Sequence, residues 1–176
     1  MTPDELSPLP ADSRVWLYGT HRPPEDGEAA RLVDATRAFL EDWTAHGSPL
    51  RAALDWRHGR FLVLAVDESR AAASGCSIDA VTGRLADLES ELDLPLLDTS
   101  PVWYRDPGRD GRIRTVSRST FRRLGREGEV DGGTVVFDLT VDRLGDVRQG
   151  LWERPAADTW HASLLPDADS SDASEA

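Results

Sequence analysis

Residues 61–66 read Phe-Leu-Val-Leu-Ala-Val and form the longest continuous apolar run in the chain. A run of this length is too short to cross a bilayer, but it is a common length for a β-strand. Because the run contains no polar residue, neither face of the strand can be left in water. The run therefore predicts a sheet covered on both faces, either by the rest of the chain or by a second subunit.

The segments around this run alternate between strand and helix patterns. Strands are expected where apolar and polar residues alternate, and helices where apolar residues recur every three or four positions. The resulting order, strand-helix-strand-strand-helix-strand, is that of a ferredoxin-like βαββαβ sandwich, an α+β fold in which two helices cover one face of an antiparallel sheet. The expected strands are 14–18, 51–57, 60–67 and 102–104, and the expected helices are 25–43 and 78–92.

The remaining sequence predicts a C-terminal β-α-β extension. Its strands are expected at 112–116 and 134–141, with a short helix at 117–125 between them. In a ferredoxin-like sandwich the face of the sheet away from the helices is usually open. We therefore expect the extension to cover that face.

The two ends differ in composition from the segment between them. Residues 1–13 have neither a basic region nor an apolar stretch, so they predict a mobile N-terminus without a signal peptide. Residues 166–176 contain four acidic residues, no basic residue and many Ser and Ala, which predicts a disordered acidic tail. We expect residues 14–165 to form a single α+β domain in the cytoplasm.

The charge of the chain is strongly acidic. All 20 basic residues are arginine, and 32 acidic residues bring the net charge to −12. The absence of lysine and asparagine is typical of a high-GC genome, and the acidic balance suits a high-salt, halophilic cytoplasm. It also argues against a general nucleic-acid binder.

Residues 105–126 have the opposite charge. They contain eight arginines against two aspartates, which gives this stretch about +6. The stretch indicates either a docking surface for an anionic partner, nucleic acid included, or arginines that pair with the acidic remainder of the chain. Internal pairing is the stronger interpretation.

Cys76 is the only cysteine, and it lies in the small-residue segment 74–77 (Ser-Gly-Cys-Ser) that joins the apolar strand to the second predicted helix. The unpaired N–H groups at a helix N-terminus favour an anion, and glycine lets a ligand approach the backbone. The segment therefore predicts a small anion-binding site with a nearby arginine. The expected ligand-binding residues are Ser74, Gly75, Ser77, Asp67, Arg60 and Arg105.

The same helix N-terminus also favours a thiolate, which makes Cys76 a candidate nucleophile. Such a nucleophile needs a base, and His46, at the end of the first predicted helix, is the candidate. Two observations oppose this interpretation. Asp79 disfavours a thiolate, and a free cysteine is commonly a small buried residue that only packs.

Several segments together resemble a family of uncharacterised bacterial proteins, and the resemblance covers most of residues 14–165. Members are sometimes labelled ABC-transporter ATPases, but this chain has no lysine and therefore no G-x-x-x-x-G-K-[ST] loop. The resemblance supports the domain boundaries and the segment around Cys76, and it implies no established activity. The matching segments are 39–47, 60–61, 67–69, 73–79, 115–117, 134–137 and 159–161.

Three functions follow from these residues. The leading prediction is a cytoplasmic binding or regulatory domain for a small anionic ligand at 74–77. The alternatives are a thiol-dependent enzyme with Cys76 as nucleophile, and a protein-interaction module or homodimer that buries its second sheet face. A single cysteine without clustered Cys/His spacing excludes a disulfide framework and argues against a structural zinc site, so no metal or cofactor is expected and no membrane partner is implied.

Overall fold

The computed structural model describes residues 5–166, which fold into a mixture of α-helices and antiparallel β-sheets. The chain forms two compact units. Unit 1 comprises Met1–Thr99 and Leu139–Leu151, and unit 2 comprises Ser100–Asp138 and Trp152–Ala176. The sequence predicts one domain over 14–165, whereas these residues are divided between the two units. The tail expected at 166–176 lies, apart from Pro166, outside the described residues.

Unit 1 is built on a three-stranded antiparallel sheet. Its strands, β1 (Arg14–Gly19), β5 (Phe61–Asp67) and β4 (Arg51–Arg57), lie in the order β1-β5-β4. The central strand β5 contains the apolar run, and all seven of its residues are buried. This confirms that both faces of the run are covered, as the lack of polar alternation predicts.

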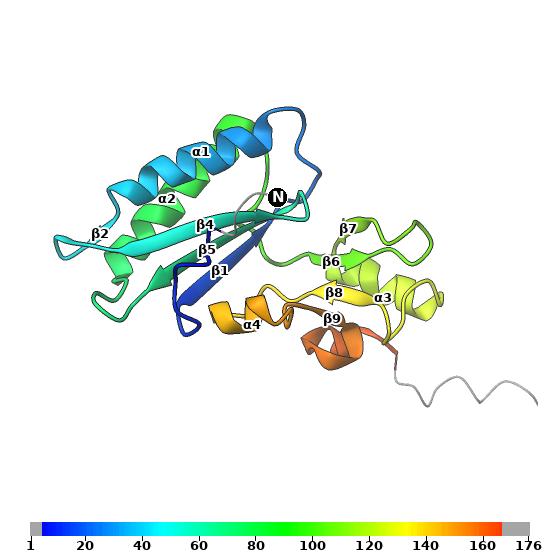
Figure 1. The fold of residues 1–176 in the computed structure, drawn as a ribbon. Coiled ribbons are helices and arrows are strands. Elements are labelled where there is room, and N and C mark those ends of the chain that lie inside the picture. Colours follow the sequence, from blue (N-terminus) through cyan, green and yellow to red (C-terminus); the bar gives the residue numbers. More distant parts are fainter. Residues whose placement is uncertain (1–4, 167–176) are drawn as a thin grey trace, which may run out of the picture. The chain divides into compact units, whose positions relative to one another are not determined.

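Two helices, α1 (Glu28–Glu41) and α2 (Gly75–Leu92), cover one face of this sheet (Figure 1). The predicted helical stripes supply the contact, because the residues at three- and four-residue spacing are the buried ones. They pack on Leu62, Leu64 and Val66 of β5. The helix residues of this core are Leu32 and Leu40 of α1 and Val81, Leu85, Leu88 and Leu92 of α2.

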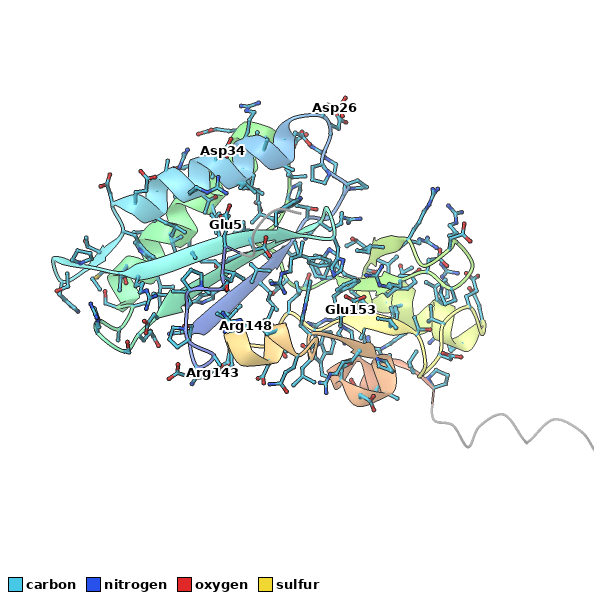
Figure 2. The ribbon with its side chains drawn as sticks, in the orientation of Figure 1. Glu5, Asp26, Asp34, Arg143, Arg148 and Glu153 are labelled. Carbon is cyan, nitrogen blue, oxygen red and sulfur yellow. The ribbon has the colours of Figure 1, made fainter. Side chains whose placement is uncertain are left out.

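The opposite side of the sheet holds residues 6–13 and the short helix α4 (Leu144–Arg148) (Figure 1), whereas Glu5 pairs with Arg37 of α1. Arg148 Nη2 donates to the carbonyl oxygens of Leu6 and Leu9 at 2.8 and 2.9 Å, and Arg143 Nη1 donates to Asp12 O at 2.9 Å. Figure 2 shows both arginines beside α4. Leu6 is fully buried. Distant parts of the chain therefore hold residues 5–13, whereas residues 1–4 of the N-terminus expected to be mobile lie outside the described residues.

Unit 2 is built on a second antiparallel sheet in the order β7-β6-β8-β9. Helix α3 (Arg118–Arg126) and two short 3₁₀ helices, Ala156–Asp158 and Trp160–Leu164, accompany it. The core of this unit includes Tyr104, Phe121 and Val136. The strands are β6 (Val102–Arg105), β7 (Ile113–Val116), β8 (Val135–Phe137) and β9 (Glu153–Pro155).

The sequence assigned 102–104 as the fourth strand of the first sheet, but these residues form β6 of the second sheet. The reason is local, since β6 forms a hairpin with β7 in which Val102 lies opposite Val116. Asp106 stabilises the turn by accepting from Gly108 N at 2.9 Å. At the outer edge of β1 a single bridge, Arg14 to Arg143, lies where a fourth strand of that sheet would pair.

Candidate functional site

The candidate site is the N-terminal turn of α2, which begins at Gly75, three residues before the predicted start. Ser74 is the N-cap: its backbone is extended (φ −84°, ψ 165°), and its Oγ accepts from Ser77 N at 3.2 Å. Ser77 Oγ donates in return to Ser74 O at 2.8 Å. This reciprocal pair stabilises the first turn, so Gly75 and Cys76 are helical residues and not part of a loop.

Two backbone donors of this turn face solvent. Ser77 N is capped, and Ile78 N donates to Ser74 O at 2.9 Å, which closes the first helical hydrogen bond. Among residues 5–166, the N–H groups of Gly75 and Cys76 have no acceptor. Both residues are exposed, and a Cβ added at Gly75 would meet nothing within 4 Å. The thiol of Cys76 is likewise exposed, so this cysteine is not a buried packing residue.

The buried side chain of Trp43 stabilises this turn by a hydrogen bond. The indole Nε1 donates to Ser77 O at 2.8 Å, and the Trp43 side chain is buried between the helices and the sheet. The ring also meets Trp16 edge-on, with 6.5 Å between centroids. The hydrogen bond from Trp43 therefore connects the turn that carries the exposed amides to the hydrophobic core. The fluorescence of Trp43 can report changes at this turn.

Acidic residues shape the loop that leads into α2. Asp67 accepts from Ser69 N at 2.9 Å and pairs with Arg51 at 3.1 Å. The hydrogen bonds from Ser69 lower the pKa of Asp67 from its usual value, and Arg51 adds to this effect. Glu68 accepts from Ala73 N at 3.1 Å. The expected role of Asp67 as a ligand contact competes with these bonds, which hold its carboxylate within the loop.

The structure does not bring Arg60 to the turn. Arg60 precedes β5 and α2 follows it, so the length of the strand, roughly 20 Å, separates them. The Arg60 guanidinium is buried and donates to Thr20 O at 2.8 Å, and burial lowers the pKa of Arg60. Arg105 belongs to unit 2, where it pairs with Glu153 and lies over the ring of Phe137.

Three other arginines lie at the α2 end of the sheet, and the sequence analysis missed them. The antiparallel register places Arg14 opposite Val66 and Arg51 opposite Asp67, where β5 ends. Arg70 follows in the exposed loop and has no side-chain partner within residues 5–166. The signal was available, since pairing the strands antiparallel places the first residues of β1 and β4 beside the last residues of β5.

His46 lies in an exposed hairpin turn between β2 (Thr44–Ala45) and β3 (Ser48–Pro49), with a left-handed φ of 50°. It does not cap α1, which ends at Glu41 with Asp42 as C-cap. Strand β2 contacts α2, so His46 and Cys76 lie on neighbouring elements. In the described part of the chain no hydrogen bond joins the two side chains. Their pairing as base and nucleophile stays a prediction.

A cavity of about 220 Å³ lies elsewhere in unit 1, between α1 and β4. Glu5, labelled in Figure 2, lies at its rim and pairs with Arg37 at 2.9 Å. Leu40, Glu41 and residues 52–54 complete its lining. None of the expected site residues lines this cavity.

Residues 5–166 contain no group of three or more His, Cys, Asp or Glu side chains arranged to hold a metal ion. No helix in this part of the chain has both the length and the apolar character required to span a membrane. No protein-family model, curated protein or solved structure matches the chain. The family resemblance and the functions expected from the sequence therefore stay predictions.

Proposed function

We propose that this protein is a binding or regulatory domain that holds a small anionic ligand at the N-terminal turn of α2. The observation that carries the proposal is the pair of exposed backbone N–H groups of Gly75 and Cys76, which have no acceptor among the described residues. The cap at Ser74 and the brace from Trp43 support the proposal, because they preorganise these donors before a ligand arrives.

The electrostatics of the turn favour a single small anion. A helix N-terminus carries about half a positive charge, and α2 has no acidic residue in its first turn to neutralise it. The carboxylates of Asp67 and Glu68 are held by hydrogen bonds in the loop and by Arg51 and Arg14. Arg70, an exposed side chain in the same loop, is the arginine that we propose contacts an ion at the turn.

The proposal is tested by two substitutions at one position. Proline at the first helical residue is well tolerated, and the extended backbone of Ser74 suits a following proline, so Gly75→Pro removes one N–H donor without breaking the helix. Gly75→Ala keeps the donor and meets no neighbour. Inorganic phosphate and sulfate are titrated by calorimetry, with Trp43 fluorescence as a second signal.

We expect the wild type and Gly75→Ala to bind with equal affinity, and Gly75→Pro to bind about tenfold more weakly, the value of one hydrogen bond to a charged group. Equal affinities for Gly75→Ala and Gly75→Pro would show that the amide is not a ligand. Absence of binding by the wild type would remove the proposal.

A second function, a thiol-dependent enzyme, is favoured by the exposure of Cys76 at a helix N-terminus. In this alternative His46 is the base that activates the thiol. Alkylation by iodoacetamide against pH separates the two functions. An apparent pKa below the free-thiol value of about 8.5 that rises in His46→Gln would support the enzyme, and a value at or above it would reject it.

We also propose that unit 1 is a ferredoxin-like arrangement in a cytoplasmic protein. The order β1-β5-β4 supports this, because the first, third and second strands of that sandwich are neighbours in this order. The homodimer alternative is weakened by the packing of residues 5–13 and α4 on the second side of the sheet. Light scattering of the purified chain tests it, since a strict monomer rejects the dimer.

A further inference from the structure

The outer face of α3 in unit 2 carries a row of exposed arginines that is independent of the turn of α2. Helix α3 buries Phe121, Leu124 and Gly125, and Ser117 caps its N-terminus by accepting from Thr120 N at 3.1 Å. Arg118, Arg122 and Arg126 recur at four-residue spacing, so they share one side of the helix. All three are exposed.

Most arginines of the basic stretch 105–126 are engaged within unit 2. Arg118 donates to Ser100 O at 3.0 Å and lies over the ring of Trp160, 4.6 Å from its centroid. Arg122 and Arg126 differ, as does Arg112 in the turn between β6 and β7, because none of these side chains has an ion pair or hydrogen bond within residues 5–166. The other ion pairs are Arg105 with Glu153, Arg109 and Arg114 with Asp106, and Arg123 with Glu127.

The last described residues pack on this helix. A Cβ at Gly125 would lie 3.0 Å from Leu165 Cδ2 and 3.2 Å from Pro166 Cδ. The absence of a side chain at Gly125 therefore lets the chain pass close to α3 at Pro166, beside Arg126 and within one helical turn of Arg122. The next ten residues, 167–176, contain four carboxylates and no basic residue.

We propose that the acidic segment 167–176 binds the exposed arginines Arg122 and Arg126 of α3 in the same chain. The segment is negatively charged and the two arginines are positively charged, so they attract each other. The segment also follows Pro166, which packs on the helix that it would bind. Ten residues can extend about 33 Å, whereas the nine residues of α3 span only about 13 Å, so every carboxylate can reach the arginines. A short tether of this kind corresponds to a millimolar effective concentration, which offsets the weakness of exposed ion pairs.

The test uses the full chain with a nitroxide spin label on Ser174→Cys, in a Cys76→Ser background. The measurement is the broadening of the backbone amide signals of α3 in NMR spectra at low salt. The test variant is Arg122→Gln/Arg126→Gln. Its matched control is Arg109→Gln/Arg112→Gln, which removes the same charge from the β6–β7 turn of the same unit.

We expect the broadening to fall severalfold in Arg122→Gln/Arg126→Gln and to persist in the control. We also expect it to disappear in 0.5 M NaCl, where the Debye length is only about 4 Å. Equal broadening in all three proteins at both salt concentrations would show that only the tether keeps the label nearby, and it would overturn the proposal. A mixture of spin-labelled chains with isotope-labelled, spin-free chains must show no broadening, because broadening there would assign the contact to a second copy.

Discussion

Gly83 in the interior of α2 and Gly125 in α3 have different surroundings. Gly83 of α2 is exposed, and a Cβ added there would meet nothing within 4 Å. Gly125 of α3 is buried under Leu165 and Pro166. The same substitution by alanine therefore separates helix propensity from close packing.

We expect Gly83→Ala to raise the free energy of unfolding by about 0.5–1 kcal/mol, because alanine loses less backbone entropy in a helix. We expect Gly125→Ala to lower the free energy of unfolding by about 1 kcal/mol despite the same entropic gain, because its Cβ would lie 3.0 Å from Leu165 Cδ2. Urea unfolding of both variants measures the difference. An equal gain at both positions would contradict the packing of 165–166 on α3.

His161 is a buried titratable residue of unit 2. It stacks on Trp160 with 3.8 Å between ring centroids, and its Nδ1 lies 2.9 Å from Thr159 Oγ1. The pKa of His161 is lowered to about 4, chiefly by burial, while Asp138 opposes this shift and Arg118 adds to it. The folded protein therefore holds this imidazole neutral at pH values where an unfolded chain would protonate it.

This difference predicts a loss of stability in acid. Above pH 6.5 neither state binds a proton at His161, so its contribution is complete there. As the pH falls from 6.5 to about 4 only the unfolded state is protonated, and we expect about 2–3 kcal/mol to be lost from the free energy of unfolding between pH 7 and pH 4.5. Urea unfolding at both pH values should show a correspondingly smaller loss in His161→Gln. The same loss in both proteins would assign the acid sensitivity to other groups.

At the scale of elements, the sequence predicted most of what lies inside periodic segments. The stripe Val81, Leu85, Leu88 and Leu92 is buried in α2, as its spacing predicts. The apolar pattern predicts that α2 begins at Ile78, whereas the helix begins at Gly75 because Ser74 is its N-cap. The sequence identifies the residues of the candidate site. It does not predict that their backbone N–H groups are exposed, because that depends on the residue at which the helix begins.

The N-terminal segment shows why other contacts escape sequence analysis. The segment 5–13 is short, contains two prolines and has no helix- or strand-like spacing of apolar residues. Its local sequence therefore does not predict that Leu6 and Leu9 are buried. The groups that hold them come from distant parts of the chain. Arg148 binds carbonyls of Leu6 and Leu9 across more than 130 residues.

We expect Arg148→Gln to loosen this segment. The amide of Leu9, which donates to Leu6 O at 3.0 Å, should exchange with solvent about tenfold faster, because each lost bond to a charged donor contributes more than 1 kcal/mol to local stability. Hydrogen exchange followed by NMR measures the change. Arg70→Gln, an exposed arginine without a partner among the described residues, is the control. Identical exchange in both variants would show that Arg148 does not hold the segment.

At the scale of the whole molecule, the pairing of strands that are adjacent in sequence determined which sheet β6 joins, and the order of helices and strands did not predict this. The sequence order favoured β6 as the fourth strand of the first sheet, yet β6 pairs with β7 and β8 in the second. A strand next in sequence, joined by a tight turn, forms its ladder at a smaller cost in loop entropy than a distant partner does. Arg60 is absent from the turn for a related reason, since its position depends on the direction of β5, which begins beside it and ends beside α2.

The proposed binding function requires that the amides of Gly75 and Cys76 bind an anion at the start of α2. The most direct test follows the backbone amide signals of the full chain by NMR while inorganic phosphate is added at constant ionic strength. We predict saturable shifts centred on Gly75 and Cys76 that are absent when chloride replaces phosphate. Shifts that fail to saturate, or that leave these two amides unmoved while others respond, would contradict it.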